Sequence, residues 1–211
     1  GLQTINGVAV LLTGTSSTFS LGTLSLVNGA KLLLPQFDPQ LSSTSTGVLG
    51  SRGDDVISGG PDGDLISGGR GADYIDGGQG PDTLLGGSGA DTLVGGGGDD
   101  VFRVDASEFD TASASGGVVY SDRIDGSAGS DVLEVNFSSQ SGRYIISQGA
   151  LANLETLRIN SGNWGQYVEL SAATLRALAV IEFNSSYGDY RPGWGKLVVQ
   201  GDGQDLNLSN V

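Results

Sequence analysis

Apolar residues recur along this chain in short runs, separated by glycine and polar turn residues. In the first 49 residues such runs stand at Val8–Leu12, Leu24–Val27 and Leu32–Leu34. Short apolar runs bounded by turn residues are typical of β-strands, so we expect an all-β protein. The runs return from residue 118 onward, at Val118–Tyr120, Val132–Val135, Tyr144–Ile146, Leu157–Ile159, Val168–Leu170, Val180–Phe183, Leu197–Val199 and Leu206–Leu208.

Between these regions, residues 50–103 repeat a nine-residue pattern six times: GSRGDDVIS, GGPDGDLIS, GGRGADYID, GGQGPDTLL, GGSGADTLV and GGGGDDVFR. A flexible glycine-rich linker has no reason to keep two residue types in one phase, so we predict a folded repeat. The sixth place is always aspartate, namely Asp55, Asp64, Asp73, Asp82, Asp91 and Asp100. The eighth place is always apolar, namely Ile57, Ile66, Ile75, Leu84, Leu93 and Phe102.

This nonapeptide resembles the calcium-binding repeat of the RTX family, and a weaker copy, GSAGSDVLE, follows at 126–134. The resemblance implies a right-handed parallel β-roll, in which each nonapeptide supplies six turn residues and three strand residues, and two nonapeptides make one coil of 18. One wall of the roll would then bury Ile57, Ile75 and Leu93, and the other Ile66, Leu84 and Phe102. Because one coil cannot cover its own apolar face, the coils must stack.

Calcium takes six to eight oxygen ligands in flexible geometry. By the resemblance, each ion lies between the turns of successive coils, with carboxylates from the sixth place and carbonyls from places two and four. The pairs Asp55/Asp73, Asp64/Asp82, Asp73/Asp91 and Asp82/Asp100 imply about four Ca²⁺ sites. Ser51 and Asp62 depart from the glycines usual at their places. The carbonyl candidates are Ser51, Gly53, Gly60, Asp62, Gly69, Gly71, Gly78, Gly80, Gly87, Gly89, Gly96 and Gly98.

Asp122 and Asp131 form a separate pair of candidates. They are nine residues apart and have Ile124 and Leu133 two places after them, as in the repeat. However, they follow Asp100 by 22 and 31 residues, and neither offset is a multiple of nine. Two interpretations therefore remain, a pair of ion ligands and a pair of ordinary turn acids.

A second period, of 24 residues, runs through the C-terminal third. The pattern L-x-x-L-x-x-[LI]-x-[IF]-N at 151–160 recurs at 175–184 and resembles a leucine-rich-repeat coil. We expect short helical turns to begin near Ser147 and Ser171, whose hydroxyls suit N-caps. We also expect two inward columns, one of Leu133, Leu157 and Ile181 and one of Ile146 and Leu170.

These patterns divide the chain into four parts: a strand-rich cap or solenoid coils at 1–49, the β-roll at 50–103, a loop at 104–117, and a C-terminal solenoid at 118–211. We predict that they form one elongated β-solenoid with a few short helical turns. The chain starts with Gly1 and not with Met, so we expect it to be a piece of a longer protein.

The composition of the chain limits the kinds of partner and of chemistry that we expect. Acids outnumber bases 24 to 10, giving a net charge of −14, which repels nucleic acid and anionic lipid. No run of 18 apolar residues exists, so we expect no membrane insertion. Cys, Met and His are all absent, which excludes Ser-His-Asp, Cys-His and zinc-finger sites. Neither G-x-S-x-G nor a Walker motif occurs, and a calcium-ligating aspartate must stay ionised, so we predict that the chain is not an enzyme.

The resemblance also implies a secreted bacterial protein, exported unfolded through a type I channel and folded by extracellular calcium. Two functions remain: a structural module of a cell-surface protein such as an S-layer protein or adhesin, and a C-terminal appendage of a secreted hydrolase, protease or epimerase. The strand-rich flanks favour the first, for which self-assembly or a cell-surface polysaccharide would be the partner. A third is carbohydrate binding through loops bearing Trp164, Trp194, Tyr167, Tyr187 and Tyr190.

Overall fold

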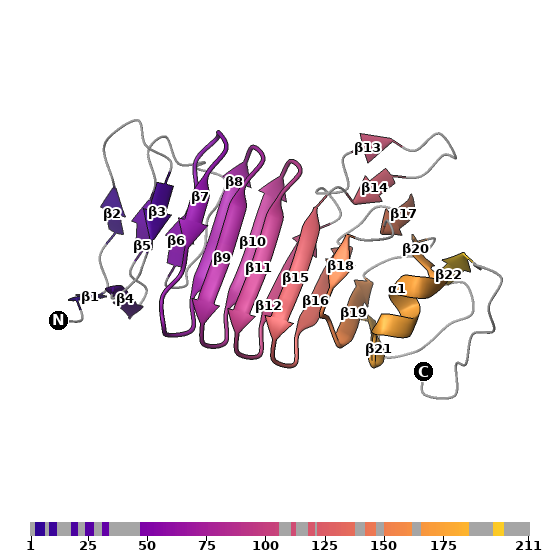
Figure 1. Ribbon diagram of the computed structural model, residues 1–211. Helices are drawn as coiled ribbons and strands as arrows, with labels where there is room; N and C mark the ends of the chain where they lie inside the picture. Colours follow the sequence, from indigo (N-terminus) through magenta and orange to yellow (C-terminus); the bar gives the residue numbers. More distant parts are fainter. Residues whose placement is uncertain are drawn as a thin grey trace.

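Parallel strands stacked side by side make up almost all of the regular structure in the computed structural model (Figure 1). It describes residues 3–6, 9–11, 18–20, 24–27, 31–33, 47–105, 111–112, 118–120, 122–137, 142–146, 150–161, 166–185 and 196–200. Across these residues every strand pairing is parallel except the one between β13 and β14. The predicted all-β parallel solenoid is therefore confirmed. Leu206–Leu208 and Ser147 lie outside the described residues.

The longest sheet in the described part of the chain, here called the long sheet, runs through all the predicted regions. It has nine strands in the order β2, β5, β6, β8, β10, β12, β16, β19 and β21. Its strands span Ala9–Leu11, Lys31–Leu33, Gly47–Leu49, Leu65–Arg70, Thr83–Ser88, Val101–Asp105, Val132–Phe137, Thr156–Ser161 and Val180–Ser185.

A second sheet forms the opposite wall of the roll. Its strands are β3 (Thr18–Ser20), β7 (Val56–Ser58), β9 (Tyr74–Gln79), β11 (Thr92–Gly97), β15 (Arg123–Ala128) and β18 (Leu151–Ala152). A separate pair joins β1 (Gln3–Asn6) to β4 (Leu24–Val27).

The repeat alternates between the two walls with the predicted period of 18. Ile57 pairs with Ile75 and Ile75 with Leu93 in the second sheet, while Ile66 pairs with Leu84 and Leu84 with Phe102 in the long sheet. All six side chains are fully buried. Both predicted columns are therefore confirmed.

The division of each repeat into strand and turn differs from the prediction. β8, β9, β10 and β11 each have six residues, so the strand continues through places one to three of the next nonapeptide. The glycines at these places pair across coils, as Gly87 does with Gly69. Without side chains their backbones can approach closely, so a stretch that composition marks as turn becomes strand.

A third wall begins where the predicted loop at 104–117 lies. There β12 extends to Asp105, and β13 (Thr111–Ala112) pairs antiparallel with β14 (Val118–Tyr120). The third sheet continues with β17 (Gly142–Ile146), β20 (Gln166–Ser171) and β22 (Lys196–Gln200). Part of the segment expected as loop therefore starts a wall, and the solenoid passes from two-walled to three-walled coils.

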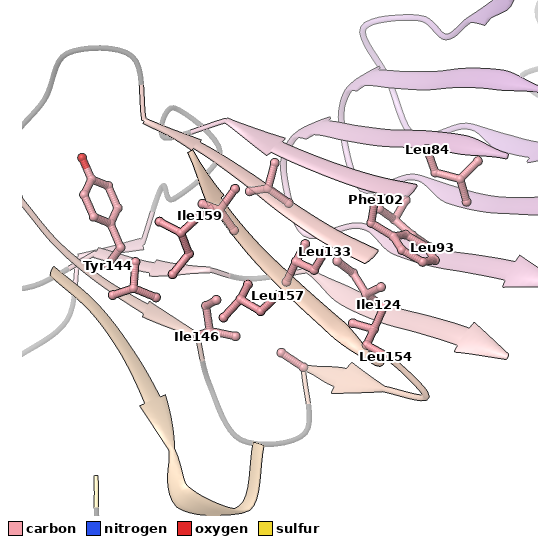
Figure 2. Close-up of a cluster of buried hydrophobic side chains, with 14 of the residues drawn as sticks. Leu84, Leu93, Phe102, Ile124, Leu133, Tyr144, Ile146, Leu154, Leu157 and Ile159 are labelled. Carbon is pink, nitrogen blue, oxygen red and sulfur yellow. The ribbon is translucent and has the colours of Figure 1, made fainter. Parts of the chain in front are cut away.

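The 24-residue period describes these three-walled coils. Leu133 pairs with Leu157 and Leu157 with Ile181 in the long sheet, and Ile146 pairs with Leu170 in the third. Figure 2 shows Leu133, Leu157 and Ile146 in the interior beyond Phe102, where they continue the column of the roll. The helix α1 (Ala172–Ala177) follows β20, and the Ser171 hydroxyl accepts a hydrogen bond from the Thr174 amide at 3.0 Å, which confirms the predicted N-cap.

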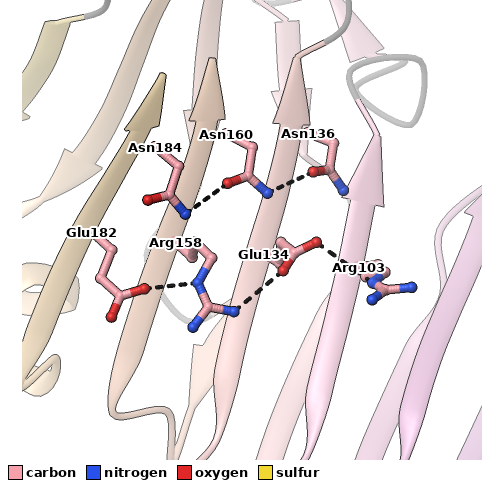
Figure 3. A network of polar contacts seen from close by, with 7 residues as sticks. All are labelled: Arg103, Glu134, Asn136, Arg158, Asn160, Glu182 and Asn184. Carbon is pink, nitrogen blue, oxygen red and sulfur yellow. Dashed lines mark hydrogen bonds and ion pairs between the residues drawn. The ribbon is translucent and has the colours of Figure 1, made fainter. Parts of the chain in front are cut away.

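The outer face of the long sheet carries two polar ladders across the three-walled coils (Figure 3). Glu134 lies between Arg103 and Arg158, at 3.5 and 3.3 Å, and Arg158 also contacts Glu182 at 2.7 Å. Beside them, side-chain amide hydrogen bonds join Asn136, Asn160 and Asn184. Opposite charges and matched amides on neighbouring strands stabilise the stacking of coils.

Among the described residues, no helix has the length and apolar character needed to span a bilayer.

Candidate metal centre

The sixth-place aspartates stand where each turn enters the next strand. Asp73 directly precedes β9, and Asp82, Asp91 and Asp100 precede β10, β11 and β12. Asp64 is half-buried, and the other five are at most 2% exposed. Burial of an ionisable side chain in every coil is costly unless each carboxylate has partners, so the partners of the two carboxylate oxygens decide what these turns can do.

The first carboxylate oxygen joins neighbouring coils. From Asp73 onward, Oδ1 accepts a hydrogen bond from the backbone amide of the sixth-place aspartate one coil earlier. The result is a ladder, which we call the aspartate ladder, running along the turns. Its bonds within the six repeats join Asp55 to Asp73, Asp64 to Asp82, Asp73 to Asp91 and Asp82 to Asp100, at 2.7 to 2.8 Å.

The aspartate ladder continues across the irregular coil to Asp122 and Asp131. The Asp91 amide donates to Asp122 Oδ1 at 2.9 Å, and the Asp100 amide donates to Asp131 Oδ1 at 2.8 Å. This coil is 31 residues long, but Leu93 still pairs with Ile124 and Phe102 with Leu133. The extra residues lie between β12 and β15, so the turns regain their alignment without a multiple of nine. The structure thus places both acids in the ladder.

The second oxygen has a different environment. Oδ2 of Asp73, Asp82, Asp100 and Asp131 is buried and accepts no hydrogen bond, and the same holds for Oδ1 of Asp55. In the first two turns, Asp55 Oδ2 instead accepts a hydrogen bond from the Ser51 amide at 2.6 Å, and Asp64 Oδ2 accepts one from the Gly60 amide at 2.7 Å. A buried carboxylate oxygen without a partner is unfavourable when ionised. Each such oxygen is therefore a candidate ligand for a cation.

A backbone carbonyl of the next coil lies beside each of these Oδ2 atoms. A Cβ added at Gly77 would come within 3.0 Å of both Asp82 Oδ2 and the Gly95 carbonyl oxygen. The same holds at Gly68 for Asp73 and Gly86, and at Gly95 for Asp100 and Gly126. These glycines occupy the first place of the repeat. The backbone carbonyls of the first place are therefore further candidate ligands, which the sequence had not indicated.

The carbonyl candidates at places two and four lie in two kinds of turn. In the last four repeats, Gly69, Gly71, Gly78, Gly80, Gly87, Gly89, Gly96 and Gly98 have φ between 96° and 140°, a conformation that favours glycine. In the first two, Ser51, Gly53, Gly60 and Asp62 do not adopt positive φ. The Ser51 and Gly60 carbonyls there accept the amides of Arg70 and Gln79. Coordination by these carbonyls stays a prediction.

Burial raises the pKa of six carboxyls of the ladder. Desolvation is the largest cause, and it raises the pKa of Asp73 to about 8, of Asp82 to about 7 and of Asp131 to about 6. The charges of neighbouring acids raise these pKa values further. The pKa values of Asp55, Asp64 and Asp100 are raised as well, again mainly by desolvation. Negative charge on Asp73 and Asp82 is therefore unfavourable at neutral pH unless a cation compensates it.

These features suit a cation that accepts mixed oxygen ligands. In the described part of the chain, no three acidic side chains converge on one point. An ion between two turns would therefore take carboxylate oxygens from successive coils and complete its shell with backbone carbonyls. Calcium tolerates such a set, whereas magnesium demands a tight octahedron.

Residues 49–84, 76–106 and 116–136 match the model of the RTX calcium-binding nonapeptide repeat (4 copies). This chain carries RTX calcium-binding repeats. The third match includes Asp122 and Asp131, in agreement with their place in the ladder. No curated protein and no solved structure was found to match the chain.

RTX repeats bind calcium and occur in exported proteins, so the matched residues form a calcium-binding module.

Sequence reasoning passed over one acid beside these residues, Glu155. It lies 24 residues after Asp131, and its carboxylate accepts a hydrogen bond from the Asp131 amide at 2.7 Å. The offset of 24 that aligns Leu133 with Leu157 also relates Asp131 to Glu155, and this signal could have found it.

Proposed function

We propose that this chain is a non-catalytic, calcium-folded structural module of an exported bacterial surface protein of the S-layer or adhesin kind. The aspartate ladder carries the proposal. In Asp73, Asp82, Asp100 and Asp131 the carboxylate is buried, one oxygen aligns neighbouring coils, and the other has no partner. Such an array is unfavourable when ionised and becomes favourable when cations bind it.

The residues of the ladder would hold calcium through Asp carboxylates of successive coils, with place-one carbonyls beside them. A bound Ca²⁺ would supply positive charge that offsets both desolvation and the repulsion between neighbouring carboxylates. Where calcium is scarce, as in the cytosol, the same carboxylates oppose closure of the coils. The chain would therefore stay unfolded for export and fold outside the cell.

A structural role is supported by the extent of the stacking. The long sheet continues on both sides of the RTX repeats, with β2 and β5 before them and β19 and β21 after them. The outer ladders of Arg, Glu and Asn connect the later coils (Figure 3). A continuous stack suits an extended surface assembly better than a short appendage to a hydrolase.

Assembly can be tested on the whole chain. The chain is titrated with Ca²⁺, followed by size measurement and negative-stain electron microscopy, with Mg²⁺ and NaCl of equal ionic strength as controls. We expect lattices or filaments that appear with calcium and disperse with EGTA. A monomer that folds with calcium and never assembles would contradict the scaffold role and favour the appendage.

Two further functions remain as predictions. A catalytic domain encoded next to this chain would support the alternative function, in which the chain is a C-terminal appendage of a secreted hydrolase, protease or epimerase. Binding on a glycan array would support carbohydrate recognition. The side chains of the aromatic residues proposed for that role lie outside the part of the chain whose side chains are described.

A further inference from the structure

Glu155 occupies the position of a sixth-place aspartate in a coil that has no nonapeptide. It directly precedes β19, as Asp131 directly precedes β16, and the two strands pair Val132 with Thr156. Glu155 lies outside the segments that match the RTX repeat. Its position therefore comes from the stacking of the coils and not from the repeat motif.

The Glu155 carboxylate also makes the contact that defines the aspartate ladder. Its Oε2 accepts the Asp131 amide at 2.7 Å, as Asp131 Oδ1 accepts the Asp100 amide at 2.8 Å. The backbone carbonyl of Glu155 accepts the Ala179 and Val180 amides at 2.8 and 2.9 Å. One residue thus joins the last rung of the ladder to the start of β21.

The space between these two turns has the features of the candidate sites within the repeats. Asp131 is 1% exposed, and its Oδ2 is buried without a hydrogen-bond partner. A Cβ added at Gly126 would come within 3.0 Å of both Asp131 Oδ2 and the Asn153 carbonyl oxygen. At Gly95, Asp100 Oδ2 and the Gly126 carbonyl are placed in the same way.

Asn153 is held in place by a contact with the neighbouring coil. Its φ is 49°, in the left-handed region that asparagine tolerates better than most residues. Its Nδ2 donates to Asp125 Oδ1 at 2.8 Å, in the neighbouring coil. The carbonyl beside Asp131 is thus set by a tertiary contact.

We propose that Asp131, Glu155 and the Asn153 carbonyl hold a further divalent cation, where the last coil of the RTX match meets the first coil beyond it. The proposal rests on the proposed function, because it assumes that the aspartate ladder binds calcium. Its consequence is that calcium orders the first 24-residue coil as well as the repeats. Folding of the C-terminal coils would then be coupled to the roll.

The test compares Glu155→Gln with Glu182→Gln in the full chain. Both remove one negative charge from the three-walled coils and leave an amide oxygen that can accept the original hydrogen bond. Calcium bound per chain is measured by equilibrium dialysis and elemental analysis. Trp164 and Trp194 follow Glu155 in the sequence, so tryptophan fluorescence reports the C-terminal coils, and far-UV circular dichroism reports total β-structure.

We expect Glu155→Gln to bind one ion fewer than the parent chain. Its tryptophan transition should need roughly tenfold more calcium, because ligand charge sets calcium affinity. Glu182→Gln should match the parent in both. Equal ion counts and equal midpoints for the two variants would overturn this site and leave the proposed function intact, whereas a parent chain that binds no calcium would overturn both.

Glu155→Asp decides the matter if Glu155→Gln fails to reach the parent's β-signal at saturating calcium. Aspartate restores the carboxylate that the repeats use at this position. We expect Glu155→Asp to bind as many ions as the parent chain. Loss of an ion in Glu155→Asp together with a parent-like β-signal would show that the carboxylate at 155 does not form the site.

Discussion

Glycine at place one leaves room for two oxygens at Gly68, Gly77 and Gly95. At Gly77 an added Cβ would collide with Asp82 Oδ2 and with the Gly95 carbonyl, although the backbone there does not need positive φ. The requirement is therefore one of space. Gly53, in the first turn, offers a matched contrast, because a Cβ there would have nothing within 4 Å.

We predict that Gly77→Ala destabilises the calcium-bound fold by about 1–3 kcal/mol through overpacking and weakens calcium binding. Gly53→Ala should be neutral, or stabilising by up to about 1 kcal/mol, because alanine lowers the entropy of the unfolded chain. Urea unfolding at fixed calcium measures both. Equal losses would show that neither position is limited by space.

Aspartates at the fifth and sixth places have different roles. Asp73 has one oxygen in the ladder and one without a partner. Asp54, at the fifth place, is exposed, and its Oδ1 accepts the Ala72 amide at 2.8 Å.

Replacing Asp73 by Ala should lower the number of bound calcium ions by about two, because Asp73 is shared between two predicted sites. Asp54→Ala should leave that number unchanged, since the exposed fifth-place side chain belongs to no predicted site. Isothermal titration calorimetry of both variants gives the ion counts. If the two substitutions remove the same number of ions, the assignment of the sixth place is wrong.

At the scale of the element, each coil unites acids that would otherwise be far apart. Asp73 lies near the charges of Asp91, Asp55 and Asp54, and all three raise its pKa beyond the effect of burial. Successive turns are held in this arrangement by strand pairing. The titration of the aspartate ladder is therefore a property of stacked coils.

This arrangement predicts how the calcium-free fold depends on pH. The pKa values of Asp73, Asp82 and Asp131 in the folded chain are about 8, 7 and 6, against about 3.9 when unfolded. The folded state then binds more protons between these values, so its stability falls as pH rises from about 4 to about 8.

Metal-free protein should accordingly keep more of its folded structure at pH 5 than at pH 8, where the ionised carboxylates favour the unfolded roll. Circular dichroism melts in chelator across this pH range check this statement. Stability that rises with pH in metal-free protein would contradict the predicted direction of the pKa shifts.

At the scale of the whole molecule, one hydrophobic column connects two kinds of coil. Phe102 pairs with Leu133 across the 31-residue coil, and Leu133 pairs with Leu157 across the first coil of 24. All three side chains are fully buried. The proposed function makes folding of the roll depend on calcium, while the three-walled coils have apolar residues from three walls and the polar ladders of Figure 3 as well.

We expect chelation to unfold the roll and to leave partial structure in the coils at 144–185. Extracellular modules bind calcium at about 10⁻⁴–10⁻³ M, and at tenfold excess each independent site contributes about 1.4 kcal/mol. Four sites would then contribute roughly 6 kcal/mol, a large share of a domain's usual net stability of about 5–15 kcal/mol.

Circular dichroism during a calcium titration should therefore show a cooperative gain of β-signal that EGTA reverses. Sodium chloride at the same ionic strength should not reproduce it, and magnesium should substitute poorly because of its tighter octahedral geometry. A spectrum unchanged by chelation, with no ions lost, would exclude calcium as the folding switch.

The repeat alone was sufficient to place Asp73, Ile75 and Leu84, because a strict period of nine in the chain becomes a period of 18 in the coil. Each residue then has the same neighbours one coil away, whatever the rest of the molecule does. The 24-residue period placed Leu157 and Leu170 in two separate inward columns for the same reason.

Only the tertiary structure decided the roles of Asp122 and Asp131. The extra residues between β12 and β15 break the numerical period, yet strand pairing restores the alignment of the turns. Counting along the chain cannot follow that step, because alignment after an insertion depends on which apolar residues pack together. The strand length of the repeat was decided in the same way, since glycines that look like turn residues pair when another coil lies beside them.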